Sequence, residues 1–431
     1  MIERYTLPEM GNLWAEENKF RTWLEVEIEA ARAMARYKII PQKAARAIAK
    51  KADFDVDRIN ELERETNHDV IAFLTSVAEH VGEEAKYLHY GMTSSDVLDT
   101  SLALLMKRAA ALIDKKIEKA VRQIRILARR YKEVPCIGRT HGVFAEPTTV
   151  GLKFAVWFSE LKRRQAAFRA ATENISYGKM SGAVGNFANL DPKVEASVCR
   201  KLGLTAAAVS TQVLQRDRHA EFLTSLALLG SSLEKFATEI RNLQRTEIGE
   251  MAEGFAEGQK GSSAMPHKKN PITAERISGI ARLLRGYALA SMENITLWHE
   301  RDIAHSSVER VIIPDATIVL DYALEKFVGV LRGLIINEGR MLENIFYGGG
   351  LVFSQRLLLK LSGPVGSREK AYRMVQRNAL AAGSGRGLFR ELVKKDKEIR
   401  QVLSVSEIDD CFDLKYYTKN VGKIFRRVFG S

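Results

Sequence analysis

The sequence predicts an all-α fold built around long helices. Its 431 residues include only nine prolines, and Pro192 is the sole proline between Pro147 and Pro266. Proline lacks an N–H and clashes with the preceding turn, so its scarcity favours long uninterrupted helices. Apolar residues also recur at spacings of three and four, which is the period of a helix packed in a bundle. A chain of this length is expected to contain two or three substructures.

Two smaller helical regions are expected to flank the middle of the chain. The N-terminal region, residues 1–93, ends close to Tyr90 and Gly91. The C-terminal region, residues 342–431, begins where the sequence YGGG interrupts the helical pattern. Glycine runs of this kind disfavour a helix because they cost backbone entropy. We therefore expect three helical domains, with residues 94–341 as the central one.

The central region is predicted to form a bundle of at least four long helices. Two of its segments, about residues 101–131 and 273–300, contain no proline. A third segment carries an unbroken apolar stripe, formed by Phe222, Leu226, Leu229, Leu233, Phe236, Ile240 and Leu243. A fourth carries a similar stripe, interrupted at Gln165 and Thr172 and formed by Phe154, Phe158, Leu161, Phe168 and Ile175. Such rods expose more than one apolar face, so we expect a homo-oligomer with a shared bundle.

Composition and charge exclude several classes of function. The net charge of +13 raises the possibility of nucleic-acid binding, but basic and acidic residues are interspersed without a basic tail or an RNA-binding motif. We therefore expect no nucleic-acid partner and an anionic small substrate instead. Three widely spaced cysteines predict neither a disulfide framework nor a zinc site. No signal peptide or membrane-spanning run is recognised, so a soluble, cytoplasmic protein without membrane contact is expected.

The segment GSSAMPHKKNP, residues 261–271, crowds hydroxyl, imidazole, ammonium and amide groups together. Asn270 before Pro271 is typical of a helix start, since Asn caps helices and Pro tolerates the first helical position. Ser262 and Ser263 precede it in a stretch with little to pack, which predicts a mobile loop that closes over an anion. The alternative is a polar loop followed by a capped helix.

Three further polar clusters lie between predicted helices. They have the sequences ETNHDV with YGMTSSD, then GRTHG, and HERDIAHSSVER. A single histidine more often has a structural role, and Thr93 with Asp96 fits a simple helix cap. Four clusters rich in anion-binding groups in one chain favour a functional site.

These motifs together resemble the fumarase/aspartase superfamily of lyases. Its signature GSSxMPxKxNP is matched at every fixed position by residues 261–271, and TNHD, GMTSSD, GRTHG, SGAVGN and ERDIAHSSVER are similar to the adenylosuccinate lyases. Ala304 stands where that family often has Ser. The resemblance implies a three-domain helical fold and a homotetramer with a central twenty-helix bundle. It also implies active sites that are each assembled from three subunits.

The chemistry implied by the resemblance is β-elimination of fumarate from a carbon–nitrogen bond. Adenylosuccinate would give AMP and SAICAR would give AICAR, both in de novo purine biosynthesis. Lys268 and Asn270 suit the developing charge on the substrate carboxylate. His141 would be the general acid, with His68 as a phosphate-binding or orienting partner. Ser262 would be the base, which requires surroundings that favour an alkoxide.

The remaining site residues are carried over from the same motifs. Glu275 either orients Lys268 or a histidine or favours the helix N-terminus electrostatically. Substrate binding is assigned to Arg4, Tyr5, Asn67, His68, Asp69, Thr93, Ser94, Gln212, Ser263, Lys268, Asn270, Arg276, Arg301, Ser306, Ser307 and Arg310. No metal and no cofactor are expected. The alternatives are a sister lyase, such as argininosuccinate lyase or fumarase, and a lyase-fold protein that has lost activity.

Overall fold

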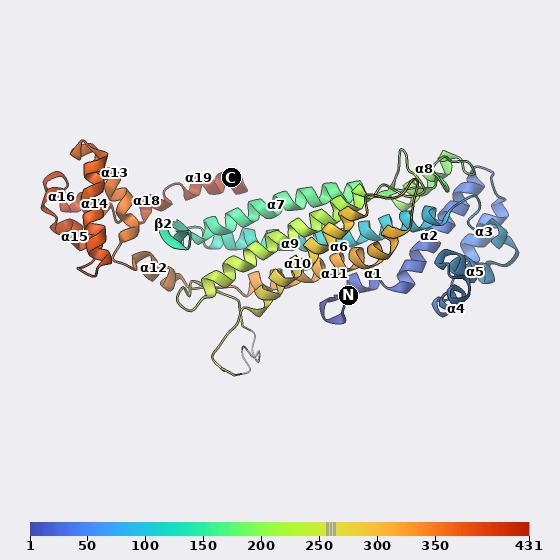
Figure 1. Cartoon of the computed structure of the whole chain (residues 1–431), viewed down its shortest axis with the longest axis horizontal. Coiled ribbons are helices and arrows are strands. Elements are labelled where there is room, and N and C mark those ends of the chain that lie inside the picture. Colours follow the sequence, from blue (N-terminus) through green and yellow to red (C-terminus); the bar gives the residue numbers. More distant parts are fainter. Residues whose placement is uncertain (256–257, 259–260, 262–263, 431) are drawn as a thin grey trace. The chain divides into compact units, whose positions relative to one another are not determined.

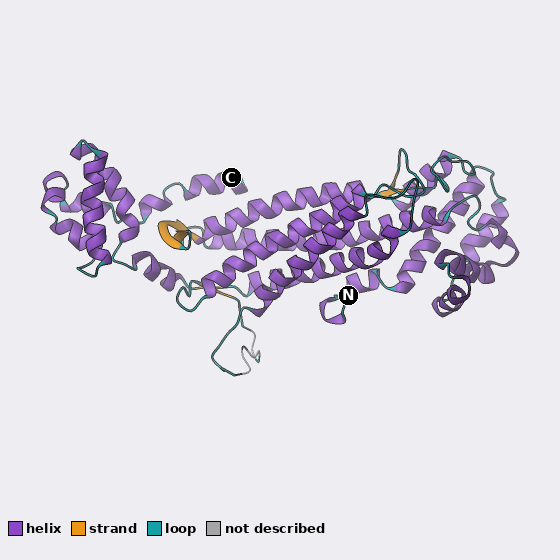
Figure 2. Cartoon of the chain, in the orientation of Figure 1, coloured by secondary structure: helices purple, strands orange, loops and turns teal. Residues whose placement is uncertain are grey.

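The computed structural model describes residues 1–255, 258, 261 and 264–430. Helices make up most of it, and the strands are short (Figures 1 and 2). This confirms the predicted all-α class. No helix in these residues is both long and apolar enough to cross a membrane.

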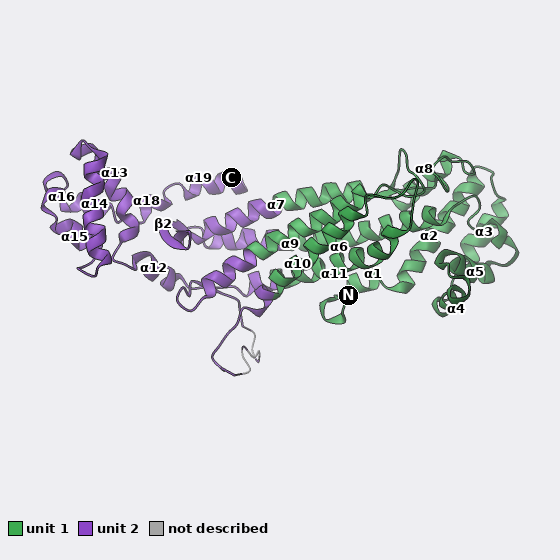
Figure 3. Ribbon diagram, viewed as in Figure 1, with its two compact units in different colours: residues 1–119, 162–235, 276–327 green, residues 120–161, 236–275, 328–431 purple. Residues whose placement is uncertain are grey.

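The chain divides into two compact units (Figure 3). The first comprises residues 1–119, 162–235 and 276–327, and the second comprises residues 120–161, 236–275 and 328–431. The division into domains 1–93, 94–341 and 342–431 stays a prediction.

The first unit contains an aromatic core under its N-terminal helices. Phe20 stacks on Phe73 with ring centroids 5.9 Å apart, and Trp23 meets Phe73 edge-on at 5.5 Å. The helical elements here are η1 (Glu3–Tyr5), α1 (Pro8–Leu13), α2 (Glu16–Arg36), α3 (Gln42–Lys51), α4 (Val56–Thr66), α5 (Asp69–Val81), η2 (Gly82–Tyr87) and α8 (Pro192–Leu202). The packing of α2 on α5 fixes the turn between α4 and α5, which carries the TNHD motif.

Five long helices form the middle of the chain (Figure 1). They are α6 (Ser94–Arg130), α7 (Val150–Ile175), α9 (Asp217–Gln244), α10 (Ile272–Glu293) and α11 (Ala304–Arg332). All seven apolar stripe residues of α9 are at most 3% exposed, as their spacing predicted.

The helix expected over residues 273–300 is shorter than predicted. It ends at Glu293, where the N–H groups of Asn294 and Ile295 form turn hydrogen bonds to Ser291 and Met292, and a loop follows. The Asp302 carboxylate accepts hydrogen bonds from the backbone N–H groups of Trp298 (2.7 Å) and Ala304 (2.8 Å). The second bond caps α11, a fifth long helix that contains Pro314 and was not predicted individually.

The C-terminal part of the second unit is a cluster of short helices. Gly348, Gly349 and Gly350 have φ values of 81°, 71° and 90°, so the YGGG sequence ends the preceding helix. The elements are α12 (Glu338–Phe346), η3 (Leu351–Phe353), α13 (Ser354–Val365), α14 (Arg368–Gly383), α15 (Phe389–Lys395), α16 (Lys397–Val402), α17 (Val405–Asp410), α18 (Lys415–Thr418) and α19 (Val421–Phe429).

Strands in the described residues form three two-stranded sheets. In the second unit, β1 (Pro135–Thr140) pairs with β2 (Val143–Thr149) and β5 (Met251–Ala252) pairs with β6 (Ile335–Ile336), both antiparallel. In the first unit, β3 (Tyr177–Gly178) runs parallel to β4 (Thr205–Ala206). The sequence did not predict the β1–β2 hairpin, which carries the GRTHG motif.

Candidate active site

The predicted general acid lies at the tip of the β1–β2 hairpin. His141 and Gly142 form its two-residue turn, with φ values of 54° and 76°. Positive φ at both positions is the conformation of a tight hairpin turn, and it explains the glycine after the histidine. His141 is exposed there. The turn therefore leaves the imidazole open to solvent.

A buried ion pair anchors the same hairpin. The Arg139 guanidinium donates two hydrogen bonds to Glu250, at 3.0 and 2.6 Å. Asn344 Nδ2 donates to Glu250 Oε1 at 2.7 Å, and the Glu250 side chain is fully buried. Glu250 immediately precedes β5, so this pair connects the hairpin to the strand that leads into the segment 261–271.

Three residues of the segment 261–271 contact one another. Asn270 Nδ2 donates to the Gly261 carbonyl at 3.0 Å. A Cβ on Gly261 would lie 2.1 Å from the carbonyl oxygen of Lys268, so only glycine fits against that backbone. Lys268 itself is exposed. Gly261, Lys268 and Asn270, which are fixed positions of the motif, therefore pack together in one local structure. Ser262 and Ser263 lie outside the described residues.

The start of α10 differs from the prediction that Asn270 caps it. The carboxylate of Glu253 accepts hydrogen bonds from the backbone N–H groups of Thr273 (3.2 Å) and Ala274 (3.0 Å). A carboxylate from another segment therefore satisfies the free N–H groups, and Asn270 binds Gly261 instead. Glu275 lies exposed in the first turn of α10, where its charge favours the helix N-terminus.

In the first unit, the structure brings the TNHD turn together with α11. Asn67 ends α4 in the left-handed conformation, and the His68 ring caps α5 by accepting from the Ile71 N–H at 3.3 Å. Asp69 accepts a hydrogen bond from Arg310 Nη2 at 2.5 Å. Arg310 is more than half exposed, so it retains donors for a ligand.

A second contact joins predicted residues from both ends of this unit. Tyr5 lies edge-on to Tyr322 with ring centroids 5.2 Å apart. Arg276 Nη1 donates to the Tyr322 hydroxyl at 2.9 Å. Tyr322 was missed by the sequence analysis, yet it links Tyr5 to Arg276. Arg4 lies beside Tyr5 in η1.

Predicted residues also line a cavity in the first unit. Arg301, Ser306 and Arg310 contribute to its wall, and its volume is about 300 Å³. Arg301 donates to Gln212 Oε1 at 3.0 Å, which brings these two predicted residues together. Ser307 lies exposed on the same helix as Ser306. The cavity combines this cationic wall with apolar side chains from α1, α2 and α6.

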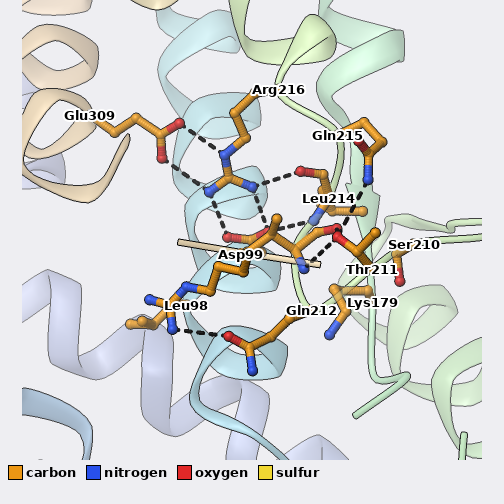
Figure 4. Close-up of polar contacts among 12 residues, drawn as sticks. Leu98, Asp99, Lys179, Ser210, Thr211, Gln212, Leu214, Gln215, Arg216 and Glu309 are labelled. Carbon is orange, nitrogen blue, oxygen red and sulfur yellow. Dashed lines mark hydrogen bonds and ion pairs between the residues drawn. The ribbon is translucent and has the colours of Figure 1, made fainter. Parts of the chain in front are cut away.

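Arg216 also lines this cavity. Figure 4 shows its guanidinium bound to Asp99 and Glu309. Its guanidinium binds Asp99 at 2.7 and 2.9 Å and Glu309 at 2.9 and 3.0 Å. Burial acts to raise the pKa of Asp99, but Arg216 and the Leu214 N–H lower it to about 2. Burial outweighs the same pairing at Glu309 and raises the pKa of that carboxyl. The network fixes α6 and α11 at the cavity.

Two motifs meet at a further buried ion pair. Asp96 of GMTSSD binds the Lys179 ammonium, and its Oδ1 also accepts from the Gly182 N–H of SGAVGN at 3.3 Å. Asp96 Oδ2 accepts from the Thr93 N–H at 2.9 Å, which is half of the predicted capping box. Ser94 begins α6 at this point. The polar sequence therefore has a structural role here as well.

His89 was also missed by the sequence analysis. Its φ is 54°, and its Nδ1 lies 2.6 Å from Oε1 of the buried Glu27. Burial acts to lower the pKa of His89, but the hydrogen bond and charge of Glu27 outweigh it and raise that pKa. The only feature of the sequence that pointed to His89 was its place directly before Tyr90, where the N-terminal region was expected to end.

The predicted site residues fall into two described groups. The first unit contains Arg4, Tyr5, the TNHD turn, Thr93, Ser94, Gln212, Arg276, Arg301, Ser306, Ser307 and Arg310. His141, Lys268, Asn270 and Glu275 belong to the second. Among the described residues, no group of three or more His, Cys, Asp or Glu side chains has the arrangement of a metal site.

Comparisons with known proteins extend this assignment. The family described as Lyase matches residues 3–286, more than half of the chain, and the family described as Adenylosuccinate lyase C-terminus matches residues 350–428. The adenylosuccinate lyase of Bacillus subtilis (strain 168) is 50% identical over 428 residues, covering 99% of each chain.

Solved structures share the whole fold. A fumarate lyase from Mesorhizobium sp. BNC1 superposes with a TM-score of 0.91 at 28% identity, covering 100% of both chains. The 3-carboxy-cis,cis-muconate lactonizing enzyme from Pseudomonas putida has a TM-score of 0.89 at 25% identity, covering 98% of this chain and 96% of its own. The chain therefore belongs to the adenylosuccinate lyase family of the fumarase/aspartase superfamily, and it is a carbon–nitrogen lyase.

Proposed function

We propose that this enzyme cleaves adenylosuccinate to AMP and fumarate, and SAICAR to AICAR and fumarate, in de novo purine biosynthesis. The observation that carries the proposal is the 50% identity to the Bacillus subtilis adenylosuccinate lyase over 99% of both chains. The fold alone would not suffice, since a muconate lactonizing enzyme has the same architecture.

The proposed reaction begins with removal of a proton next to the substrate carboxylate. Ser262 is the proposed base, and the intermediate carries its extra charge on that carboxylate. Fixed cations and donors aimed at this charge lower the barrier most effectively. The exposed Lys268 ammonium and the Asn270 amide have the right chemistry, with Ser263 as a further donor.

Cleavage of the carbon–nitrogen bond then requires a proton for the leaving nitrogen. His141 is the proposed acid, and its exposed position at a tight turn supports this role. His68, which caps α5 through one ring nitrogen, is the proposed partner for phosphate or orientation. Glu275 remains a candidate for orienting one of these groups.

The nucleotide phosphate and the remaining carboxylate need cationic partners. Arginine suits both because its planar fork binds two oxygens at once. Arg301 and Arg310 line one cavity with Ser306, and they are the proposed core of this subsite. The other proposed contacts are Arg4, Tyr5, Asn67, Asp69, Thr93, Ser94, Gln212, Arg276 and Ser307.

We further propose a cytoplasmic homotetramer whose active sites each draw on three subunits. Helix α10 supports a packed oligomer, because Leu283, Leu289 and Met292 are 44%, 61% and 44% exposed in the single chain. Exposed apolar side chains on one long helix favour burial against another subunit.

A spectrophotometric assay with adenylosuccinate tests the proposal. The substrate chromophore should disappear while fumarate and AMP accumulate in equal amounts. Turnover of argininosuccinate or malate instead would contradict it and assign a sister lyase. Inactivity towards all three substrates would favour a lyase-fold protein without this activity.

A further inference from the structure

We infer that Gln244 and Glu253 are positioning residues for Lys268 and Asn270, because they hold the backbone that follows Lys268, at Lys269 and at the start of α10. The inference rests on the proposed function, because it assigns these two residues the task of orienting carboxylate-binding groups. Neither Gln244 nor Glu253 was recognised from the sequence.

Gln244 bridges two backbone positions that are distant in the sequence. It is the last residue of α9. Its Oε1 accepts a hydrogen bond from the Glu253 N–H at 2.9 Å, and its Nε2 donates to the Lys269 carbonyl at 3.0 Å. To bind the Glu253 N–H and the Lys269 carbonyl together, the end of the side chain must carry both an acceptor and a donor. A primary amide meets this requirement, whereas a carboxylate or a thioether does not.

Glu253 continues the connection into α10. Its side chain is only 7% exposed, and its carboxylate accepts from the N–H groups of Thr273 and Ala274. These are N–H groups that the helix itself leaves free, and the negative charge is favourable at a helix N-terminus. Gln244 thus holds the backbone of Glu253 while the side chain of Glu253 holds the start of α10.

These contacts and those of Gly261 hold the backbone from the Lys268 carbonyl onwards. The Lys268 carbonyl packs against Gly261, where a Cβ would approach it to 2.1 Å. The next carbonyl, that of Lys269, is the one bound by Gln244, and Asn270 then donates to Gly261. The Lys268 side chain remains exposed while its peptide neighbours are held. The Lys268 ammonium can therefore contact a ligand while the backbone that carries it is held in place.

The test is the variant Gln244→Met in the full-length enzyme. Methionine keeps the length of the side chain and removes both hydrogen bonds. We expect kcat for adenylosuccinate to fall about tenfold to a hundredfold, because small misplacements of binding groups have effects of this order. Product inhibition by fumarate should weaken about tenfold, since fumarate binds through the carboxylate site. Inhibition by AMP should stay within about twofold, because its phosphate contacts are elsewhere.

Two further variants make the result specific. Gln376→Met is the matched control, because Gln376 is an exposed residue of α14 in the same unit, and it should behave like wild type. Glu253→Gln should shift kcat and fumarate inhibition in the same direction as Gln244→Met, with AMP inhibition retained.

The outcomes separate this inference from the proposed function. Wild-type kcat and fumarate inhibition in Gln244→Met would overturn the inference alone. Equal losses of fumarate and AMP inhibition in both variants would also overturn it, since they indicate general disruption. A wild-type enzyme that forms no AMP and fumarate would overturn the proposed function and this inference with it.

Discussion

Arg139 and Glu250 form two hydrogen bonds in parallel, Nη1 to Oε2 at 3.0 Å and Nη2 to Oε1 at 2.6 Å. Glu250 is completely buried and Arg139 is 14% exposed. Arg139 lies two residues before His141 in the same hairpin. The position of the proposed acid therefore depends on a charge that is far from it in sequence.

Glu250→Ala should destabilise the protein strongly. Removing one partner leaves the Arg139 charge buried without compensation, which costs about 3–5 kcal/mol of unfolding free energy. Urea denaturation measures the loss. Glu343→Ala is the control, because it breaks the exposed Arg340–Glu343 pair and should cost under about 1 kcal/mol. Equal losses in the two variants would contradict the structural role of Glu250.

His141→Ala should lose activity without losing stability. The side chain is exposed at a turn, so few packing contacts depend on it. We expect kcat to fall by about 10²–10⁴, the usual contribution of a general acid, while the melting temperature stays unchanged. Steady-state kinetics and a thermal melt measure both. A variant with near wild-type kcat would remove His141 from the acid role.

Ser262→Ala should abolish turnover and leave substrate affinity largely intact. The reason is that a base acts on the transition state and contributes little to ground-state binding. Single-turnover kinetics and equilibrium binding of adenylosuccinate separate the two quantities. Retention of more than a few per cent of activity would exclude Ser262 as the base.

Stability should decline in mild acid because two histidines are buried uncharged. Burial and Arg216 lower the pKa of His219 to about 3 and that of His305 to about 4. The unfolded chain binds these protons near pH 6.5, so unfolding is favoured as the pH falls from 6.5 towards 4. Each histidine contributes a slope of about 1.4 kcal/mol per pH unit in this window.

Urea denaturation at pH 7.5 and 5.5 measures this slope. His219→Gln should flatten it, whereas His80→Gln, which replaces an exposed histidine at the end of α5, should leave it unchanged. Identical slopes in wild type and His219→Gln would show that another group causes the acid sensitivity.

The cysteine thiols should be unreactive in the native protein. Cys136, Cys199 and Cys411 are all buried, and burial raises the pKa of Cys136 and Cys199 to about 12. Since the thiolate is the nucleophile, we expect reaction with a thiol-specific disulfide reagent at pH 8 to be on the order of a hundredfold slower than after unfolding. Reaction of any native thiol at the rate of N-acetylcysteine would contradict this.

The sequence predicted helices that depend on a local apolar repeat, and it missed helix ends and contacts that depend on residues distant in the sequence. The stripe from Phe222 to Leu243 repeats within each helical turn, so it identified α9 correctly. The predicted end of α10 was wrong, because residues after Glu293 form turns and a loop although no proline or glycine marks that point. The prediction that Asn270 caps α10 was wrong as well, because the capping carboxylate belongs to Glu253, which lies outside the helix.

The candidate site shows the same division. Motif resemblance selected His141 and Lys268 without any knowledge of their surroundings. It did not select Glu250, Gln244 or Tyr322, whose contacts with the site cross many residues of sequence. A single sequence contains no signal for such pairs, since each partner is an ordinary polar residue when taken alone.

The Arg216 network imposes a restriction on how this protein can diverge. Arg216 pairs with both Asp99 from α6 and Glu309 from α11, and all three side chains are at least 93% buried. Replacing Arg216 leaves two buried carboxylates without their cation, and replacing Asp99 or Glu309 leaves buried guanidinium N–H groups without their acceptors, both of which cost stability. The three positions should therefore be inherited as a block, so that related chains either keep all three charges or substitute them together.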